Sequence, residues 1–177
     1  MPGFFARIKD YFDNRRVMLR RFIGLAVSAF TLLALVSCIS YVFTWKQDQS
    51  LLLDPGMMDS TASVAANFGG KLGLRLSAFL VNDLFGLGAF AVVVALVILS
   101  VRLVFGERKF SVIKSLVLAI VAAVLMSFVL AYFSLRTGLE NTLGGSLGGE
   151  CGLQGIKWME TMVGSIVTFF ILVIFCI

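Results

Sequence analysis

Long apolar segments alternate with short polar ones along this chain. The clearest apolar segment lies between Asp83 and Arg102, where eighteen consecutive residues carry no charge. As a helix rising 1.5 Å per residue, this segment is about 27 Å long, close to the roughly 30 Å hydrocarbon core of a bilayer. Three further segments have the same character. The pattern therefore predicts an all-α integral membrane four-helix bundle, with spans at about residues 22–44, 80–104, 116–134 and 161–177.

The polar segments between these spans predict the connections. Two long outer loops, residues 45–79 and 135–160, and one short inner loop, residues 105–115, join the four spans of a membrane domain at residues 22–177. Helical sequence begins near Leu74, so we expect the outer end of the second span to follow the membrane surface before it enters. The two tryptophans, Trp45 and Trp158, lie beside span ends, where indole rings favour the membrane interface.

Residues 1–21 form a basic tail with six cations and two acids. Its apolar residues recur at helical spacing, which predicts a short amphipathic cytoplasmic helix on the membrane surface or a frayed basic tail. Four more cations occur between Arg102 and Lys114, whereas the two outer loops share five cations that acids offset. The positive-inside rule then places both termini of this multi-pass protein in the cytoplasm.

Composition agrees with a lipid environment and excludes several kinds of chemistry. The 177 residues are 59% hydrophobic and 14% charged, against about a quarter charged in an average soluble domain. The sequence contains no histidine, so Ser-His and Cys-His catalysis and histidine metal sites are excluded. Cys38, Cys151 and Cys176 lack zinc-site spacing, and we expect no catalytic residue, cofactor or metal. Cys38 follows a lipoprotein-like box, yet its apolar block is too long for a signal peptide, so an uncleaved helix is favoured over lipidation.

The third predicted span carries a stripe of small residues on one face. Ala119, Ala123, Ser127 and Ala131 recur at four-residue intervals. Small side chains let a neighbouring helix approach closely in a membrane. The stripe therefore predicts a helix-packing face, and the hydroxyl groups within the spans are interpreted as helix-to-helix hydrogen bonds.

Glycine clusters indicate an internal repeat. Gly69, Gly70 and Gly73 precede the second span, and Gly144, Gly145 and Gly148 precede the fourth. A further glycine follows each cluster, at Gly86 and Gly164. Both halves run helix, outer loop, glycine cluster, helix in one direction, so the pattern predicts two parallel helix-loop-helix repeats, although glycine-rich loops also resemble one another by chance.

Several of these motifs, in this order, resemble the amino-terminal membrane domain of the FtsK/SpoIIIE family of DNA translocases. The resemblance covers nearly the whole chain from Phe22 onward. It is carried by Ser40-Tyr41-Val42-Phe43-Thr44-Trp45 with Asp48-Gln49-Ser50, by Asn67-Phe68-Gly69-Gly70-Lys71-Leu72-Gly73, by Phe85-Gly86 and by Gly144-Gly145-Ser146-Leu147-Gly148.

This resemblance implies a four-helix anchor in the bacterial inner membrane at the division septum, followed by a hexameric ATP-driven motor that moves DNA. It implies a homo-oligomer that contacts the lipid bilayer and division-site membrane proteins, and contacts DNA only through the motor. The chain departs from the full family pattern because it contains no G-x-x-x-x-G-K-[ST] phosphate loop. Its apolar sequence stops at Ile177, and we expect a fragment cut at its last helix. The fragment itself is expected not to be an enzyme.

Two other functions fit the spans alone. A small multi-span transporter or channel needs ionisable groups or broken helices near the bilayer midplane. Three of the predicted spans carry no charge, and in the second Asp83 and Arg102 bracket the charge-free apolar segment. A generic membrane scaffold subunit is the other alternative, and a soluble extension containing a phosphate loop would separate it from the translocase anchor.

Overall fold

The computed structural model describes residues 3–106 and 111–176, with side chains described from Arg15 to Phe175 within those ranges. Every regular element within the described residues is helical, which confirms the predicted all-α class. In chain order the elements are α1 (Gly3–Leu53), α2 (Pro55–Asp59), α3 (Gly70–Ser77), the π-helix η1 (Ala78–Phe85), the 3₁₀ turn η2 (Gly86–Gly88), α4 (Ala89–Phe105), α5 (Val112–Thr137), the 3₁₀ turn η3 (Thr142–Gly144), α6 (Gly149–Val163) and α7 (Ser165–Cys176).

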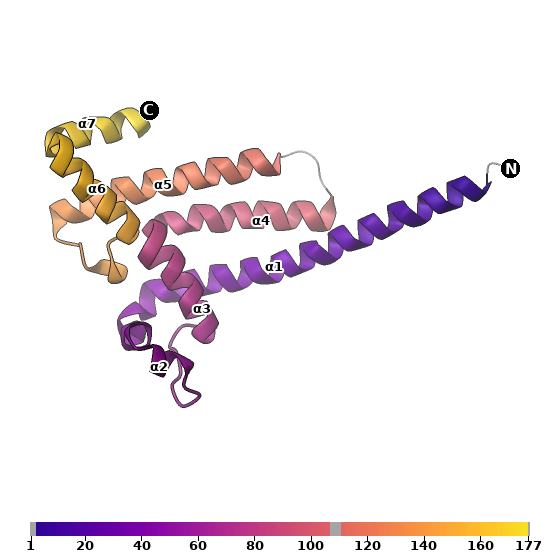
Figure 1. Ribbon diagram of the computed structural model, residues 1–177, viewed down its shortest axis with the longest axis horizontal. Helices are drawn as coiled ribbons and strands as arrows, with labels where there is room; N and C mark the ends of the chain where they lie inside the picture. Colours follow the sequence, from indigo (N-terminus) through magenta and orange to yellow (C-terminus); the bar gives the residue numbers. More distant parts are fainter. Residues whose placement is uncertain (1–2, 107–110, 177) are drawn as a thin grey trace.

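The first helix is longer than the sequence pattern predicts. The chain has two prolines, Pro2 and Pro55, and α1 occupies nearly all of the sequence between them. Because proline breaks a helix interior and no other proline intervenes, the basic tail continues directly into the first apolar segment. The backbone of residues 3–21 is therefore part of α1 and not a separate surface helix (Figure 1).

Three helices have the length and composition of membrane spans. They are Arg15–Leu53, the partly broken helix Gly70–Phe105, and Val112–Thr137. A fourth apolar helix, Ser165–Phe175, is shorter than the roughly 20 residues that a straight span requires. The described residues thus form a membrane helical bundle with three span-length helices.

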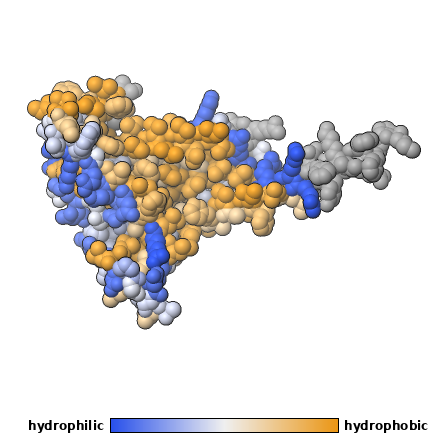
Figure 2. All heavy atoms as spheres, viewed as in Figure 1, coloured by the Kyte–Doolittle hydropathy of each residue, from blue (hydrophilic) through white to orange (hydrophobic). Residues whose placement is uncertain are grey.

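The long helices lie in a row. In Figure 1, α1, α4 and α5 run side by side, and α7 lies beyond α5; contacts join α1 to α4, α4 to α5, and α5 to α7. The helices α3 and α6 cross the end of the row remote from the N-terminus, which we call the distal end. Figure 2 shows an apolar band over the row with hydrophilic residues at both of its ends. This distribution is what a bilayer requires of a bundle that crosses it.

The predicted outer loops contain helices. Residues 45–79 include the last turns of α1, all of α2 and all of α3, and residues 135–160 include most of α6. The chain turns into α2 at Asp54-Pro55-Gly56, where the Asp54 carboxylate caps the helix by accepting a 2.8 Å hydrogen bond from the Gly56 N–H. The predicted inner-loop cations Arg108 and Lys109 lie outside the described residues.

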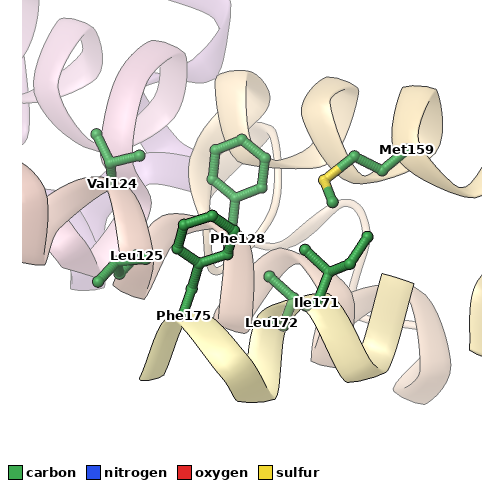
Figure 3. A pocket seen from close by; sticks show the side chains of 7 residues that line it. All are labelled: Val124, Leu125, Phe128, Met159, Ile171, Leu172 and Phe175. Atoms are coloured by element: carbon green, nitrogen blue, oxygen red, sulfur yellow. The ribbon is translucent and has the colours of Figure 1, made fainter. Parts of the chain in front are cut away.

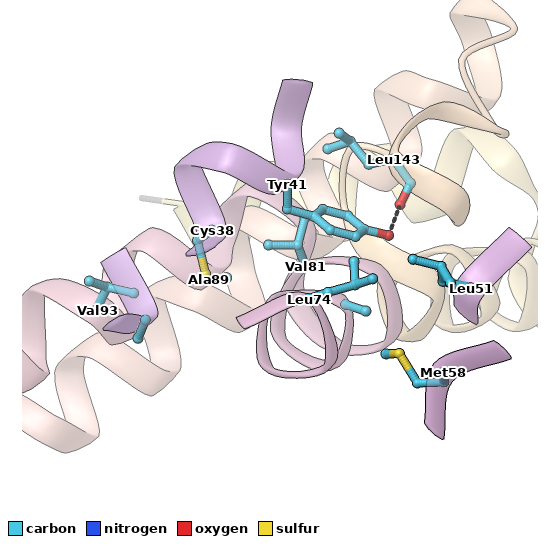
Figure 4. Packing of buried hydrophobic residues seen from close by; sticks show 11 residues of the cluster. Cys38, Tyr41, Leu51, Met58, Leu74, Val81, Ala89, Val93 and Leu143 are labelled. Carbon is cyan, nitrogen blue, oxygen red and sulfur yellow. Dashed lines mark hydrogen bonds between the residues drawn. The ribbon is translucent and has the colours of Figure 1, made fainter. Parts of the chain in front are cut away.

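The largest core cluster holds the distal half of α1 against α3, η1 and α4. Cys38 and Tyr41 of α1 are buried against Leu74, Val81 and other residues of these elements. The Tyr41 hydroxyl donates a 3.2 Å hydrogen bond to the Leu143 carbonyl oxygen, more than a hundred residues away in the second half of the chain (Figure 4). A buried tyrosine hydroxyl needs such a partner, so this bond ties the second loop to the first helix.

Candidate functional site

The glycine clusters lie at the distal end, where they begin the two crossing helices. In the first, Asn67 Oδ1 accepts a 2.9 Å hydrogen bond from the Gly69 N–H, and the Gly70 N–H donates a 2.8 Å bond to the Asn67 carbonyl oxygen. Gly70 has a φ of +63°, which side chains other than that of glycine rarely adopt. This turn starts α3 directly after the loop.

A matching turn starts α6. Ser146 Oγ accepts a 3.1 Å hydrogen bond from the Gly148 N–H, and the Gly149 N–H donates a 3.0 Å bond to the Ser146 carbonyl oxygen. Gly149 has a φ of +77°. The side chain of a small polar residue thus closes both turns on the backbone two residues ahead, as Asn and Ser commonly do.

These hydrogen bonds give the register of the internal repeat. Asn67-Phe68-Gly69-Gly70-Lys71-Leu72-Gly73 corresponds to Ser146-Leu147-Gly148-Gly149-Glu150-Cys151-Gly152. The predicted pairing of Gly69–Gly73 with Gly144–Gly148 is therefore wrong by four positions. Gly144 and Gly145 instead lie ahead of the second turn, where Gly144 ends η3 beside the Asn82 side chain.

Each turn packs against a serine of a long helix. A Cβ on Gly69 or Gly73 would overlap Ser37 Oγ of α1, and a Cβ on Gly152 would approach the Ser127 carbonyl oxygen of α5 to 2.8 Å. Glycine fits these positions because a Cβ would overlap the serine side chain or, at Gly152, also the α5 backbone. The repeat unit is thus a long helix crossed by a glycine-rich helix.

The two repeats differ by one residue, and the difference explains the π-helix. Gly86 follows Gly73 by thirteen positions, whereas Gly164 follows Gly152 by twelve. A π-helix holds one more residue per hydrogen-bonded turn than an α-helix. The extra residue of the first repeat is accommodated by η1, while α6 continues as a regular α-helix to Val163.

The two repeats meet at Gly86 and Gly149, a contact that we call the glycine junction. The Leu87 N–H donates a 2.9 Å hydrogen bond to the Leu147 carbonyl oxygen. A Cβ on Gly149 would lie 2.7 Å from the Gly86 nitrogen, and a Cβ on Gly86, whose φ is +59°, would lie 2.5 Å from the Gly149 nitrogen. Backbone therefore packs directly on backbone where the second half of the chain meets the first.

The small-residue stripe of α5 receives this junction. Ala123, Ser127 and Ala131 are buried, whereas Ala119 is partly exposed. A Cβ on Gly88 would lie 2.5 Å from the Ala123 carbonyl oxygen, which shows how closely the start of α4 approaches α5. Ser127 Oγ donates a 2.5 Å hydrogen bond to the Gly148 carbonyl oxygen.

The predicted interface tryptophans both belong to helices at the distal end. Trp45 lies in α1, packed on the first core cluster with Lys46 Nζ 5.4 Å from its ring centroid. Trp158 lies in α6 and is 63% exposed.

The sequence predicts no role for Asp48 beyond its place in the family motif, yet its contacts hold the first loop. Asp48 is buried in α1, and its two carboxylate oxygens accept hydrogen bonds of 2.7 Å and 3.0 Å from the N–H groups of Ala66 and Asn67. The Asn67 side-chain amide donates in turn to the Ser37 carbonyl oxygen at 3.0 Å. An acid in a predicted loop is the one sequence feature that could indicate this role. Its backbone partners are eighteen and nineteen residues away, so no local pattern links them to it.

Ion pairs and cations stabilise the surrounding loops. Arg75 pairs with Asp59 at 2.7 Å, and Arg136 of α5 pairs with Glu160 of α6 at 2.5 Å. Lys71 Nζ bonds to Ser63 Oγ at 2.8 Å and so holds the loop between α2 and α3. Within the described residues, no group of three or more histidine, cysteine, aspartate or glutamate side chains could hold a metal ion.

An apolar bundle with span-length helices and polar ends defines a multi-pass helical membrane domain. The family model for the 4TM region of DNA translocase FtsK/SpoIIIE matches residues 16–177, so the chain belongs to this family. This region is the membrane part of the translocase and not its ATPase motor. No curated protein and no solved structure matches the chain.

Proposed function

We propose that this domain anchors a cell-division DNA translocase in the cytoplasmic membrane and concentrates its ATP-driven motor at the division septum. The match of residues 16–177 to the translocase membrane region carries the proposal. An anchor needs no chemistry of its own; it confines its motor to a small zone, which raises the effective concentration of neighbouring subunits. DNA is contacted by the motor alone.

The distribution of cations supports four spans with both termini in the cytoplasm. Arg15, Arg16, Arg20 and Arg21 lie along α1 at the end of the row opposite the distal end. Arg20 also lies beside Gly106, the left-handed cap at the C-terminal end of α4, where the helix dipole favours a cation. In the proposed topology α7 returns toward this same face as the fourth span.

The helix break at Gly86 supports an anchor over a transporter. Broken helices in transporters expose backbone groups to a substrate site at the bilayer midplane. Here the break is filled by the backbone of Leu147, Gly148 and Gly149, and the Leu87 N–H is already bonded. The break therefore serves to join the two repeats.

We propose that residues at the distal end target the domain to the septum. Apolar side chains in lipid do not distinguish one part of the membrane from another, whereas α6 presents polar and aromatic residues away from the bundle. Gln154 and Trp158 are exposed on α6, on the side opposite its buried residues Leu153 and Ile156. We propose that division-site membrane proteins bind this end.

A localisation experiment tests the anchor. Residues 1–177 fused to a fluorescent protein are expected to gather at the division site, with no motor attached. Replacing Gln154 and Trp158 by alanine is expected to spread the signal around the cell periphery while membrane insertion is retained. The control is Ile113→Ala, an exposed position in the first turn of α5, at the end of the row away from α6. This variant should leave the septal signal unchanged. A uniform signal from the unaltered fusion would contradict the targeting role.

A further inference from the structure

Each of the two glycines of the glycine junction has a counterpart in the other repeat, and neither counterpart is in contact with another part of the described chain. In the repeat register, Gly164 corresponds to Gly86 and Gly70 corresponds to Gly149. Gly86 and Gly149 pack backbone to backbone, yet a Cβ on Gly164 or on Gly70 would meet no atom within 4 Å. Both open glycines keep the positive φ of their counterparts, +80° and +63°. Gly164 and Gly70 therefore have the backbone conformation of the two sides of the junction, but no described residue packs on either one.

These two glycines lie at opposite ends of the helix row. Gly164 connects α6 to α7 at one edge, and Gly70 begins α3, which packs on α1 at the other edge (Figure 1). Phe68, beside Gly70, is 82% exposed. Its counterpart Leu147 is partly buried against the first core cluster, and its carbonyl oxygen accepts the bond from Leu87.

The packing of α7 also shows that the second repeat lacks a neighbour. In the first repeat α4 is held between α1 and α5, and a Cβ on Gly24 of α1 would lie 2.8 Å from the Val104 nitrogen. In the second repeat an apolar cavity of about 220 Å³ remains between α5, α6 and α7, lined by Phe128, Leu172 and Phe175 among others (Figure 3). The main contacts of α7 among the described elements are with α5 and α6, and several of its large apolar side chains are exposed.

We propose that the α7 edge of one copy docks on the α1 edge of a second copy and repeats the glycine junction between molecules. Gly164 meets Gly70 of the next copy, and the Ser165 N–H lies where it donates to the Phe68 carbonyl oxygen, as Leu87 does to Leu147 within the chain. The long helix α1 of the next copy then takes the place beside α7 that α5 takes beside α4.

This contact is head-to-tail, since two different surfaces meet. Head-to-tail contacts form rings when the rotation closes and open filaments when it does not. The two repeats run in the same direction through the bundle, so docked copies keep the same orientation in the membrane. The membrane holds every copy in one plane, and repetition of the contact therefore extends the helix row within that plane.

Single-cysteine variants of the full chain distinguish this arrangement from others. The background carries Cys38→Ala, Cys151→Ser and Cys176→Ser. One copy carries Phe68→Cys and one epitope tag, and a second copy carries Ser165→Cys and another tag. Co-expressed in membranes and treated with a short bis-maleimide, the mixture is expected to yield a dimer containing both tags, and each variant alone is expected to remain monomeric on a denaturing gel.

Controls decide the remaining outcomes. In one chain that carries both Leu87→Cys and Leu147→Cys, the bis-maleimide should join the two cysteines, so that the monomer band no longer has free thiols to label. This result shows that the chain is folded and that the reagent spans the junction. Ser165→Cys mixed with Ile113→Cys, an exposed position far from both glycines, should give no dimer. Absence of the mixed Phe68–Ser165 dimer while the intrachain control reacts would overturn the proposal. Equal cross-linking of either variant with itself would also overturn it, because that result requires a two-fold contact.

Discussion

Ser127 donates a hydrogen bond to the carbonyl oxygen of Gly148, and this 2.5 Å contact joins α5 to the turn that begins α6. In the first repeat Ser37 occupies the equivalent place beside Gly69, but its buried Oγ has no hydrogen-bond partner within the described residues. The two serines occupy matching positions of the repeat but differ in their effect on stability. Ser127 forms a buried hydrogen bond, whereas Ser37 buries a hydroxyl that has no partner within the described residues.

Alanine at these two positions should separate the contributions. Ser127→Ala is expected to lower the free energy of unfolding by about 0.5–1.5 kcal/mol, because the Gly148 carbonyl loses a buried donor. Ser37→Ala removes an unpartnered buried hydroxyl and should be neutral or slightly stabilising. Denaturant titration in detergent micelles measures both, and an equal loss for the two variants would contradict the hydrogen-bond assignment.

The glycine junction predicts a second difference, between two glycines of positive φ. Gly138→Ala incurs backbone strain of about 1–2 kcal/mol and nothing more, since no atom lies within 4 Å of its Cβ. Gly86→Ala incurs the same strain and in addition forces apart the backbones of Leu147 and Gly149, which should cost about 1–3 kcal/mol more. The same titration compares them, and similar losses would show that the junction tolerates a methyl group.

The small stripe of α5 predicts a third pair of variants. Ala123 is fully buried beneath Gly88, so Ala123→Ile should destabilise the fold by about 1–3 kcal/mol through overpacking. Val124, the next residue, is 37% exposed and borders the α5–α7 cavity, so Val124→Ile should change the stability little. Equal effects would place the stripe against lipid.

The sequence predicts the all-α class and the three span-length apolar helices, but its repeat register is wrong. Hydropathy locates helices because their interior residues need lipid or protein around them, whichever way they pack. The register depends instead on which hydrogen bonds close each turn, and the similar strings at Gly69 and Gly144 hid the correspondence of Asn67 with Ser146. A search for Gly-Gly-x-x-Gly two residues after a small polar side chain would have found it.

The role of Asp48 shows a second limit. Its partners, the N–H groups of Ala66 and Asn67, come close only after α1 has extended past Trp45 and the chain has folded back. A local sequence pattern does not predict where the chain folds back onto α1. The length of α1 was underestimated for a related reason: charge and polarity suggested boundaries, whereas the absence of proline between Pro2 and Pro55 allowed the helix to continue.

Thiol labelling tests most directly whether the domain is an anchor with its distal end outside the cell and its termini inside. Cys151 is exposed on α6, and Cys38 is buried in α1. In a Cys176→Ser background, a membrane-impermeant maleimide added to intact cells is expected to label Cys151. With Cys151→Ser in addition, a cysteine placed at Arg16 or Ser111 should be labelled only after the cells are permeabilised. Labelling of Arg16→Cys or Ser111→Cys in intact cells, or protection of Cys151 there, would contradict the proposed topology.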